Sequence, residues 1–69
     1  MNAANASASN GINEMELQTL RHLILSHETM SGKMSAYAED STTPEIRQYF
    51  EKAAQNAADA KNQLMSFLK

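Results

Sequence analysis

Between residues 17 and 38, large apolar residues return every three or four positions, which is the spacing of one face of an α-helix. Asn13 precedes this stretch and Glu16 follows it three residues later, a pairing that forms a capping box at the start of a helix. The pattern therefore predicts a helix over about residues 14–39. Its a and d heptad rows are Leu17, Leu20, Ile24, His27, Ser31, Met34 and Ala38, and the adjacent row is Leu23, Met30 and Tyr37.

A second apolar pattern of the same period follows the only proline of the chain. Thr43 is a candidate N-cap, and Pro44 suits the first helical position because a missing N–H costs nothing there. These signals predict a helix over about residues 44–68. Three alanines at the centre of its apolar rows permit a close approach to another helix. The a and d rows are Ile46, Phe50, Ala53, Ala57, Ala60, Leu64 and Phe67.

The short connection between two helices of nearly equal length predicts an all-α fold, an antiparallel helical hairpin. Residues 13–69 would form it as a single domain. One hairpin cannot bury all eighteen large apolar side chains of the chain, because each of its helices has only one neighbour. We therefore expect a homodimer in which two hairpins form a four-helix bundle. The residues expected to lie outside the seam of one hairpin are Leu23, Leu25, Ala54, Met65 and Leu68.

His27 occupies a d position among apolar neighbours, and Asn56 falls opposite it in the predicted hairpin. We interpret the two as a buried polar pair whose hydrogen bond fixes the register of the helices. The alternative is a metal ligand or a pH-sensitive group that two copies share at the dimer axis. The full set expected to form the core and the interface is Leu17, Leu20, Leu23, Ile24, His27, Met30, Met34, Phe50, Ala53, Ala57, Ala60, Leu64 and Phe67.

Ser31, Gly32 and Ser35 place a patch of small residues in the middle of the first predicted helix. Glycine inside a helix costs about 1 kcal/mol relative to alanine, so its presence calls for a local reason. Two reasons fit the sequence equally well. The patch is either a close contact with another helix or the site of a slight kink.

Composition narrows the chemistry that this chain can perform. With no cysteine it has no disulfide scaffold and no thiolate zinc site, and its net charge of −2 provides no basic surface for nucleic acid. None of its six glutamates has a histidine three positions later, as the Glu-x-x-His motif of a di-iron bundle requires. We expect no catalytic residue, no metal site and no cofactor, and hence a protein that is not an enzyme.

Residues 1–12 are mostly small and polar, and the sequence predicts a flexible, low-complexity arm there. The first thirteen residues contain no Lys or Arg and no run of seven apolar residues, so no secretory signal peptide is expected. No stretch of the chain approaches the eighteen apolar residues of a membrane span.

Two segments, Leu-Ile-Leu-Ser-His-Glu-Thr-Met at 23–30 and Tyr-Ala-Glu-Asp-Ser-Thr-Thr-Pro-Glu-Ile-Arg at 37–47, resemble the spore coat protein F family. The resemblance covers about 50 of the 69 residues. It implies a ferritin-like helical hairpin from a spore-forming bacterium, with a structural role and no catalytic residue. His27 and Glu28 stand where the family more often has Glu-Lys. The positions that fit are Ser26, Thr29, Met30, Tyr37, Glu39, Thr43, Pro44, Glu45 and Arg47.

The sequence thus leads to three hypotheses of different kinds. The first is a structural or assembly protein of the spore coat type, located in the coat or the cytoplasm of a spore-forming bacterium. Its partners would be a second copy of itself and other coat proteins. The second is a small helical adaptor that binds a regulatory or enzyme partner through its exposed apolar residues. The third is a ferritin-like protein that binds a metal.

Overall fold

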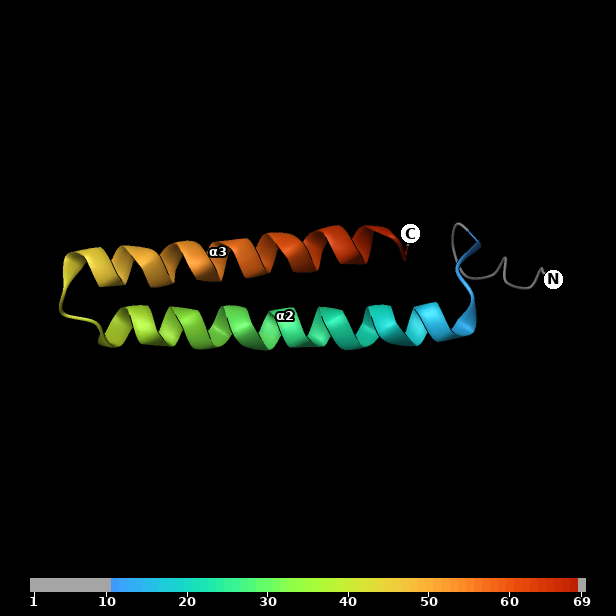
Figure 1. Cartoon of the computed structure of the whole chain (residues 1–69), viewed down its shortest axis with the longest axis horizontal. Coiled ribbons are helices and arrows are strands. Elements are labelled where there is room, and N and C mark those ends of the chain that lie inside the picture. The colour runs from blue at the N-terminus through green and yellow to red at the C-terminus, as the bar shows by residue number, and fades with distance from the viewer. Residues whose placement is uncertain (1–10, 69) are drawn as a thin grey trace.

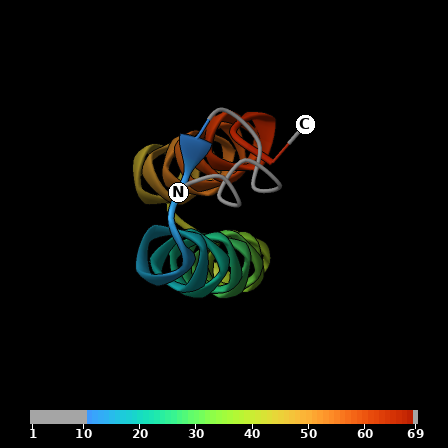
Figure 2. The same ribbon diagram turned by 90° about the vertical axis from the view of Figure 1, so that its right-hand side faces the viewer.

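The computed structural model describes residues 11–68 and has two α-helices, α2 (Glu14–Asp40) and α3 (Pro44–Ser66), with no strand among the described residues. The helices run antiparallel and lie side by side over most of their length, and a short connection joins them at one end (Figure 1). A view along the hairpin shows each helix covered on one side only by the other (Figure 2). The predicted all-α helical hairpin is therefore confirmed. Most of the arm predicted over residues 1–12 lies outside the described residues.

Helix α2 starts at the capping box that the sequence predicts. The backbone N–H of Glu16 donates to Oδ1 of Asn13 at 2.8 Å, and the backbone N–H of Asn13 donates to Oε1 of Glu16 at 3.1 Å. Two N–H groups that would lack a partner in the first turn are thereby satisfied. The helix continues through Gly32 to Asp40, one residue beyond the predicted end.

The connection between the helices is held by the side chain of Arg47 rather than by the predicted side-chain cap. Thr43 occupies the N-cap position of α3 in extended conformation, but its side chain makes no capping hydrogen bond. The guanidinium of Arg47 instead donates from Nη2 to the carbonyl oxygen of Ser41 at 3.0 Å. Pro44 is at the first helical position, as predicted. The turn is therefore held by an arginine that reaches back over it.

Helix α3 ends at Ser66, two residues before its predicted end. The N–H of Phe67 donates to the carbonyl of Leu64 at 3.1 Å, and the N–H of Leu68 donates to that of Met65 at 3.0 Å. These bonds span three residues rather than four, which is the tightening common in the last turn of a helix.

The seam between the helices is narrow and built around alanine. Among the described residues only Ala38, Ala54 and Ala57 are buried, at 4%, 7% and 7% exposure, and no large side chain is fully buried. From α2 the seam takes the predicted a and d rows, all at least partly buried. From α3 it takes Phe50, Ala54, Ala57, Lys61 and Leu64, and Ala53, Ala58 and Ala60 lie partly buried beside it.

The face that α3 turns to α2 is rotated from the predicted one by about one position. Ala54 was expected outside the seam but is buried in it, whereas Ile46 and Phe67 were expected in the core and are about half exposed. A hydrogen bond from Oγ of Ser31 to the carbonyl oxygen of Ala54, 3.0 Å long, joins the helices at this point. A backbone carbonyl can be reached in this way only where the facing residue is small. The pair of Ser31 and Ala54 therefore marks a close approach of the two helices in the observed rotation of α3.

Candidate functional site

Large apolar side chains are the most prominent feature of the hairpin's surface. Several belong to rows that flank the seam, and others lie on the outer sides of the helices. Those more than a third exposed are Met15, Leu23, Leu25, Met30, Tyr37, Ile46, Tyr49, Met65, Phe67 and Leu68. Such a set is more than a hairpin of this size needs to expose, and its distribution over the surface is uneven.

On α2, one side of the seam is lined by Leu23, Met30 and Tyr37. These residues are seven apart, so they share a row, and each directly precedes a seam residue. All three are between 37% and 47% exposed. The same row begins at Glu16, whose carboxylate is already bound in the capping box. From residue 17 to the end of α2 the row is entirely apolar.

On α3, the corresponding row is Ile46, Ala53, Ala60 and Phe67, again seven residues apart. Ala53 and Ala60 directly precede the seam residues Ala54 and Lys61, as the apolar residues of α2 precede theirs. In an antiparallel pair of helices, the rows that precede the seam positions lie on the same side of the pair. The next row outward on α3 is Tyr49, Asn56 and Gln63, each three residues beyond a member of the first row. The equivalent outer row on α2 is Thr19, Ser26, Lys33 and Asp40, and it forms the edge of this side.

Aromatic contacts join the two helices on this side near the connection. The ring of Tyr37 from α2 lies 5.5 Å from that of Phe50, and the ring of Tyr49 lies 5.8 Å from the same Phe50 ring at an interplanar angle of 71°. Tilted and edge-to-face pairs at these distances are favourable. We name this side of the hairpin the uncharged face, and it comprises Leu23, Met30, Tyr37, Ile46, Tyr49, Ala53, Asn56, Ala60, Gln63 and Phe67.

The other side of the seam has a different character. Its two rows, again with a spacing of seven residues, run from Glu14 to Ser35 on α2 and from Glu51 to Met65 on α3, and four of their seven side chains are glutamate or arginine. We name it the charged face, and it comprises Glu14, Arg21, Glu28, Ser35, Glu51, Ala58 and Met65. The rows directly beside the seam thus differ between the two faces in their content of charge.

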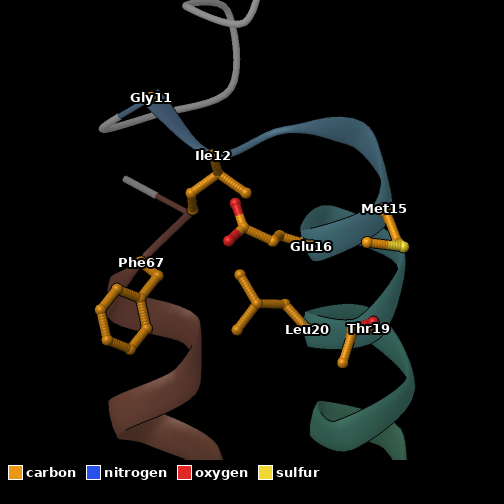
Figure 3. Close-up of a pocket in the computed structure, with 7 residues that line it drawn as sticks. All are labelled: Gly11, Ile12, Met15, Glu16, Thr19, Leu20 and Phe67. Carbon is orange, nitrogen blue, oxygen red and sulfur yellow. The ribbon is translucent and has the colours of Figure 1, made fainter.

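A hollow of about 670 Å³ opens at the end of the hairpin where α2 begins, lined by Gly11, Ile12, Met15, Glu16, Thr19, Leu20 and Phe67. Figure 3 shows Ile12, Glu16 and Leu20 reaching into the space between the helices, with Phe67 on the α3 side. The lining is mainly apolar. Its single carboxylate, that of Glu16, accepts the N–H of Asn13.

The predicted buried polar pair of His27 and Asn56 is wrong for the single chain. His27 is partly buried in the seam, and its Nδ1 lies 2.8 Å from the carbonyl oxygen of Leu23 one turn earlier. A carbonyl only accepts, so Nδ1–H is the donor, and this nitrogen has its partner within the same helix. Asn56 is exposed on the uncharged face because the rotation of α3 moves it away from the seam.

Other predicted features can now be located. In residues 11–68, no three side chains of the types His, Cys, Asp and Glu come together as a metal site. No described helix is long and apolar enough to cross a membrane. Of the small patch on α2, Ser31 makes the contact with α3, whereas a Cβ added to Gly32 would meet nothing within 4 Å.

The predicted core and interface residues fall into two groups. Those in or beside the seam at partial or full burial are Leu17, Leu20, Ile24, His27, Met34, Phe50, Ala53, Ala57, Ala60 and Leu64. Leu23, Met30 and Phe67 are exposed on the uncharged face. Sequence reasoning missed Ala54, although the spacing of Ala54 and Ala57 was available as a signal. In comparisons with known proteins, no family model, no curated protein and no solved structure matches this chain.

Proposed function

We propose that this protein is a structural or assembly protein that acts by associating with copies of itself. One observation carries the proposal: within residues 11–68, the single chain buries three alanines and no large side chain. Chains of this size without disulfides or metals usually gain the missing apolar burial by oligomerising. The chain contains no cysteine, so a disulfide does not replace that burial.

A dimeric four-helix bundle is the simplest assembly that meets this need. Two hairpins packed face to face give every helix two neighbours instead of one, at the shallow crossing angle of such bundles. Leu23, Met30 and Phe67, which the single hairpin leaves exposed, would then lie in the core. The absence of ionised side chains on the uncharged face supports this arrangement.

The biological setting that we propose is the spore coat, on the resemblance of residues 23–30 and 37–47 to the spore coat protein F family. A small protein that self-associates through helix faces is suited to building a layered structure. In this role the protein is found in the coat or, before assembly, in the cytoplasm of a spore-forming bacterium, with other coat proteins as further partners.

Sedimentation equilibrium of the purified chain tests self-association. The chain has a mass of 7.6 kDa, so the proposal expects a species of twice that mass over a wide range of concentration. A helical species that stays at 7.6 kDa at millimolar concentration would contradict it. Fractionation of sporulating and growing cells tests the setting separately, and presence only in the cytosol of growing cells would count against a coat role.

The exposed uncharged face also favours a second candidate, a helical adaptor that binds another protein. An adaptor's apolar face is free when the protein is alone and covered when the partner is present. A folded monomer that forms a stable complex with one cellular protein would favour the adaptor over the structural role.

A further inference from the structure

We propose that a second copy of this chain covers the uncharged face, with Met30 of one copy inserted between Ala53 and Ala60 of the other. The inference rests on the proposed self-association and adds the surface and the central contact through which it occurs. Three features of the face support it, namely its charge, its area and its shape.

The distribution of charge favours this face over the opposite one. The rows directly beside the seam on the uncharged face, those of Leu23 and Ile46, have no ionised side chain from residue 17 onward, and Lys33 stands further out on α2, at the edge of the contact. Packing two charged faces would desolvate Glu14, Arg21, Glu28 and Glu51 of each copy. Desolvating a charge costs more than its new partners return unless the geometry is excellent. The uncharged face is therefore the side that a partner can cover without this penalty.

The area of the face is sufficient for a stable dimer. Helix α3 has 23 residues, which corresponds to a length of roughly 35 Å at a rise of 1.5 Å per residue. Two helices side by side, each about 10 Å across, give a width of roughly 20 Å and an area of about 700 Å² per copy. Specific interfaces bury about 800 Å² per partner. One hairpin face thus has nearly the area of a standard interface.

The shape of the face is complementary to itself. Leu23, Met30 and Tyr37 form a ridge of large side chains on α2, while Ala53 and Ala60 leave a groove on α3. The hydrogen bond from Ser31 to Ala54 places Met30 at the same level of the hairpin as this alanine stretch. When α3 of a partner hairpin packs over α2 of the first copy, the alanines of the partner therefore face Met30 of the first copy. Methionine is flexible enough to fill such a hole.

A second copy is the occupant that this arrangement favours. A twofold dimer uses the same patch on both molecules, so each patch must carry both a protruding part and a recess to receive it. The uncharged face has both, with the ridge on one helix and the groove on the other. In a twofold dimer the contact of Met30 with the alanine groove forms twice.

Matched charge substitutions test the proposal by sedimentation. Met30→Glu and Leu25→Glu change the same helix in the same way, five residues apart, and the side chains are 46% and 62% exposed. Leu25 lies outside the uncharged face. We expect Met30→Glu to raise the dimer Kd by roughly a hundred-fold or more, and Leu25→Glu to change it by less than about three-fold.

The outcomes of this experiment distinguish a failure of self-association from a failure of the proposed interface. A wild-type chain that is monomeric overturns the self-association and the interface together. A wild-type dimer that Met30→Glu leaves intact overturns the interface only, and a dimer that Leu25→Glu dissociates instead places the contact on another side of α2.

Cysteine cross-linking provides a test that does not depend on the folding of a charged variant. The natural chain has no cysteine, so a Met30→Cys chain can be mixed with a tagged Ala53→Cys chain under mild oxidation. We expect a disulfide-linked heterodimer of the two chains at several-fold higher yield than from Leu25→Cys mixed with the same tagged chain. Equal yields from the two mixtures would overturn the proposed contact.

Discussion

The uncharged and charged faces of this hairpin are built from the same two helices and flank the same seam, yet they differ in nearly every side chain. On α2, Leu23 and Met30 precede seam residues, whereas Arg21 and Glu28 follow them. The backbone is the same on both sides. The difference shows that the fold offers two equivalent surfaces and that the residue pattern alone distinguishes them.

The comparison also explains why the seam itself can be so small. Alanine at positions 54 and 57 brings the helices close together, but it adds little apolar area to the hairpin. The larger apolar residues stand beside the seam, where a single hairpin leaves them half exposed. On our account, the stability that the seam lacks is supplied by association through the uncharged face.

The largest expected effect on dimerisation comes from placing charges on the uncharged face, so that it resembles the charged one. The double substitution Leu23→Glu and Tyr37→Glu places two charges on the uncharged face, and each would be buried without a partner in the dimer. We expect a loss of at least about 4 kcal/mol in dimerisation free energy, roughly a thousand-fold in Kd, measured by sedimentation equilibrium.

The control for this double substitution adds the same charge elsewhere. Gln18 and Gln48 are exposed and lie outside both faces. The double variant Gln18→Glu and Gln48→Glu should keep the dimer with less than a ten-fold change in Kd. If both double variants dissociate alike, net charge rather than the uncharged face controls association.

The next largest effect is expected from a substitution in the seam that separates the two faces. Ala54→Leu adds bulk at a buried position whose carbonyl accepts the Ser31 hydroxyl, so the helices must move apart or the side chain must strain. We expect a loss of about 1–3 kcal/mol in the free energy of unfolding, measured by urea denaturation. Ala58→Leu, at a partly buried position on the charged face, should cost less. A larger loss for Ala58→Leu than for Ala54→Leu would contradict the observed rotation of α3.

A smaller effect is expected from the aromatic cluster at the connection. Tyr49 is 70% exposed and contacts Phe50, so the single chain loses little when Tyr49→Ala is made. A partner that covers the uncharged face would bury this ring, and its loss should then weaken the dimer by about 1–2 kcal/mol, roughly ten-fold in Kd. A lower free energy of unfolding with no change in the dimer Kd would contradict a role of Tyr49 at the interface.

The smallest effect is expected from removing charge on the opposite face. Exposed charges contribute little to stability, and the double variant Arg21→Ala and Glu28→Ala should change the free energy of unfolding by less than about 1 kcal/mol. Its dimer Kd should stay within about three-fold of the wild-type value. A dissociated double variant would show that the charged face takes part in the contact.

Much of this structure follows from short-range signals in the sequence. The capping box of Asn13 and Glu16 and the break at Pro44 locate three of the four helix ends closely, and the heptad rows of α2 identify its side of the seam. The rotation of α3 does not follow from them. With alanines at positions 53, 54, 57, 58 and 60, several faces of α3 are almost equally apolar, so periodicity cannot distinguish among them.

The candidate site depends on that rotation, and this is why the sequence located only part of it. Leu23, Met30 and Phe67 were expected to be buried in the assembly, but Asn56 was assigned to a buried pair with His27. The hydrogen bond between Ser31 and Ala54 is a contact across 23 residues that no local pattern encodes. In the observed rotation of α3, Asn56 lies on the uncharged face and His27 bonds within its own helix.

The most direct test of the account is an isotope-filtered NOE spectrum of a mixture of labelled and unlabelled chains, which detects only contacts between copies. The account predicts cross-peaks between the methyl group of Met30 in one chain and those of Ala53 and Ala60 in the other. Intermolecular cross-peaks from Leu25 and Met65 in place of these would contradict it, because those residues lie outside the uncharged face.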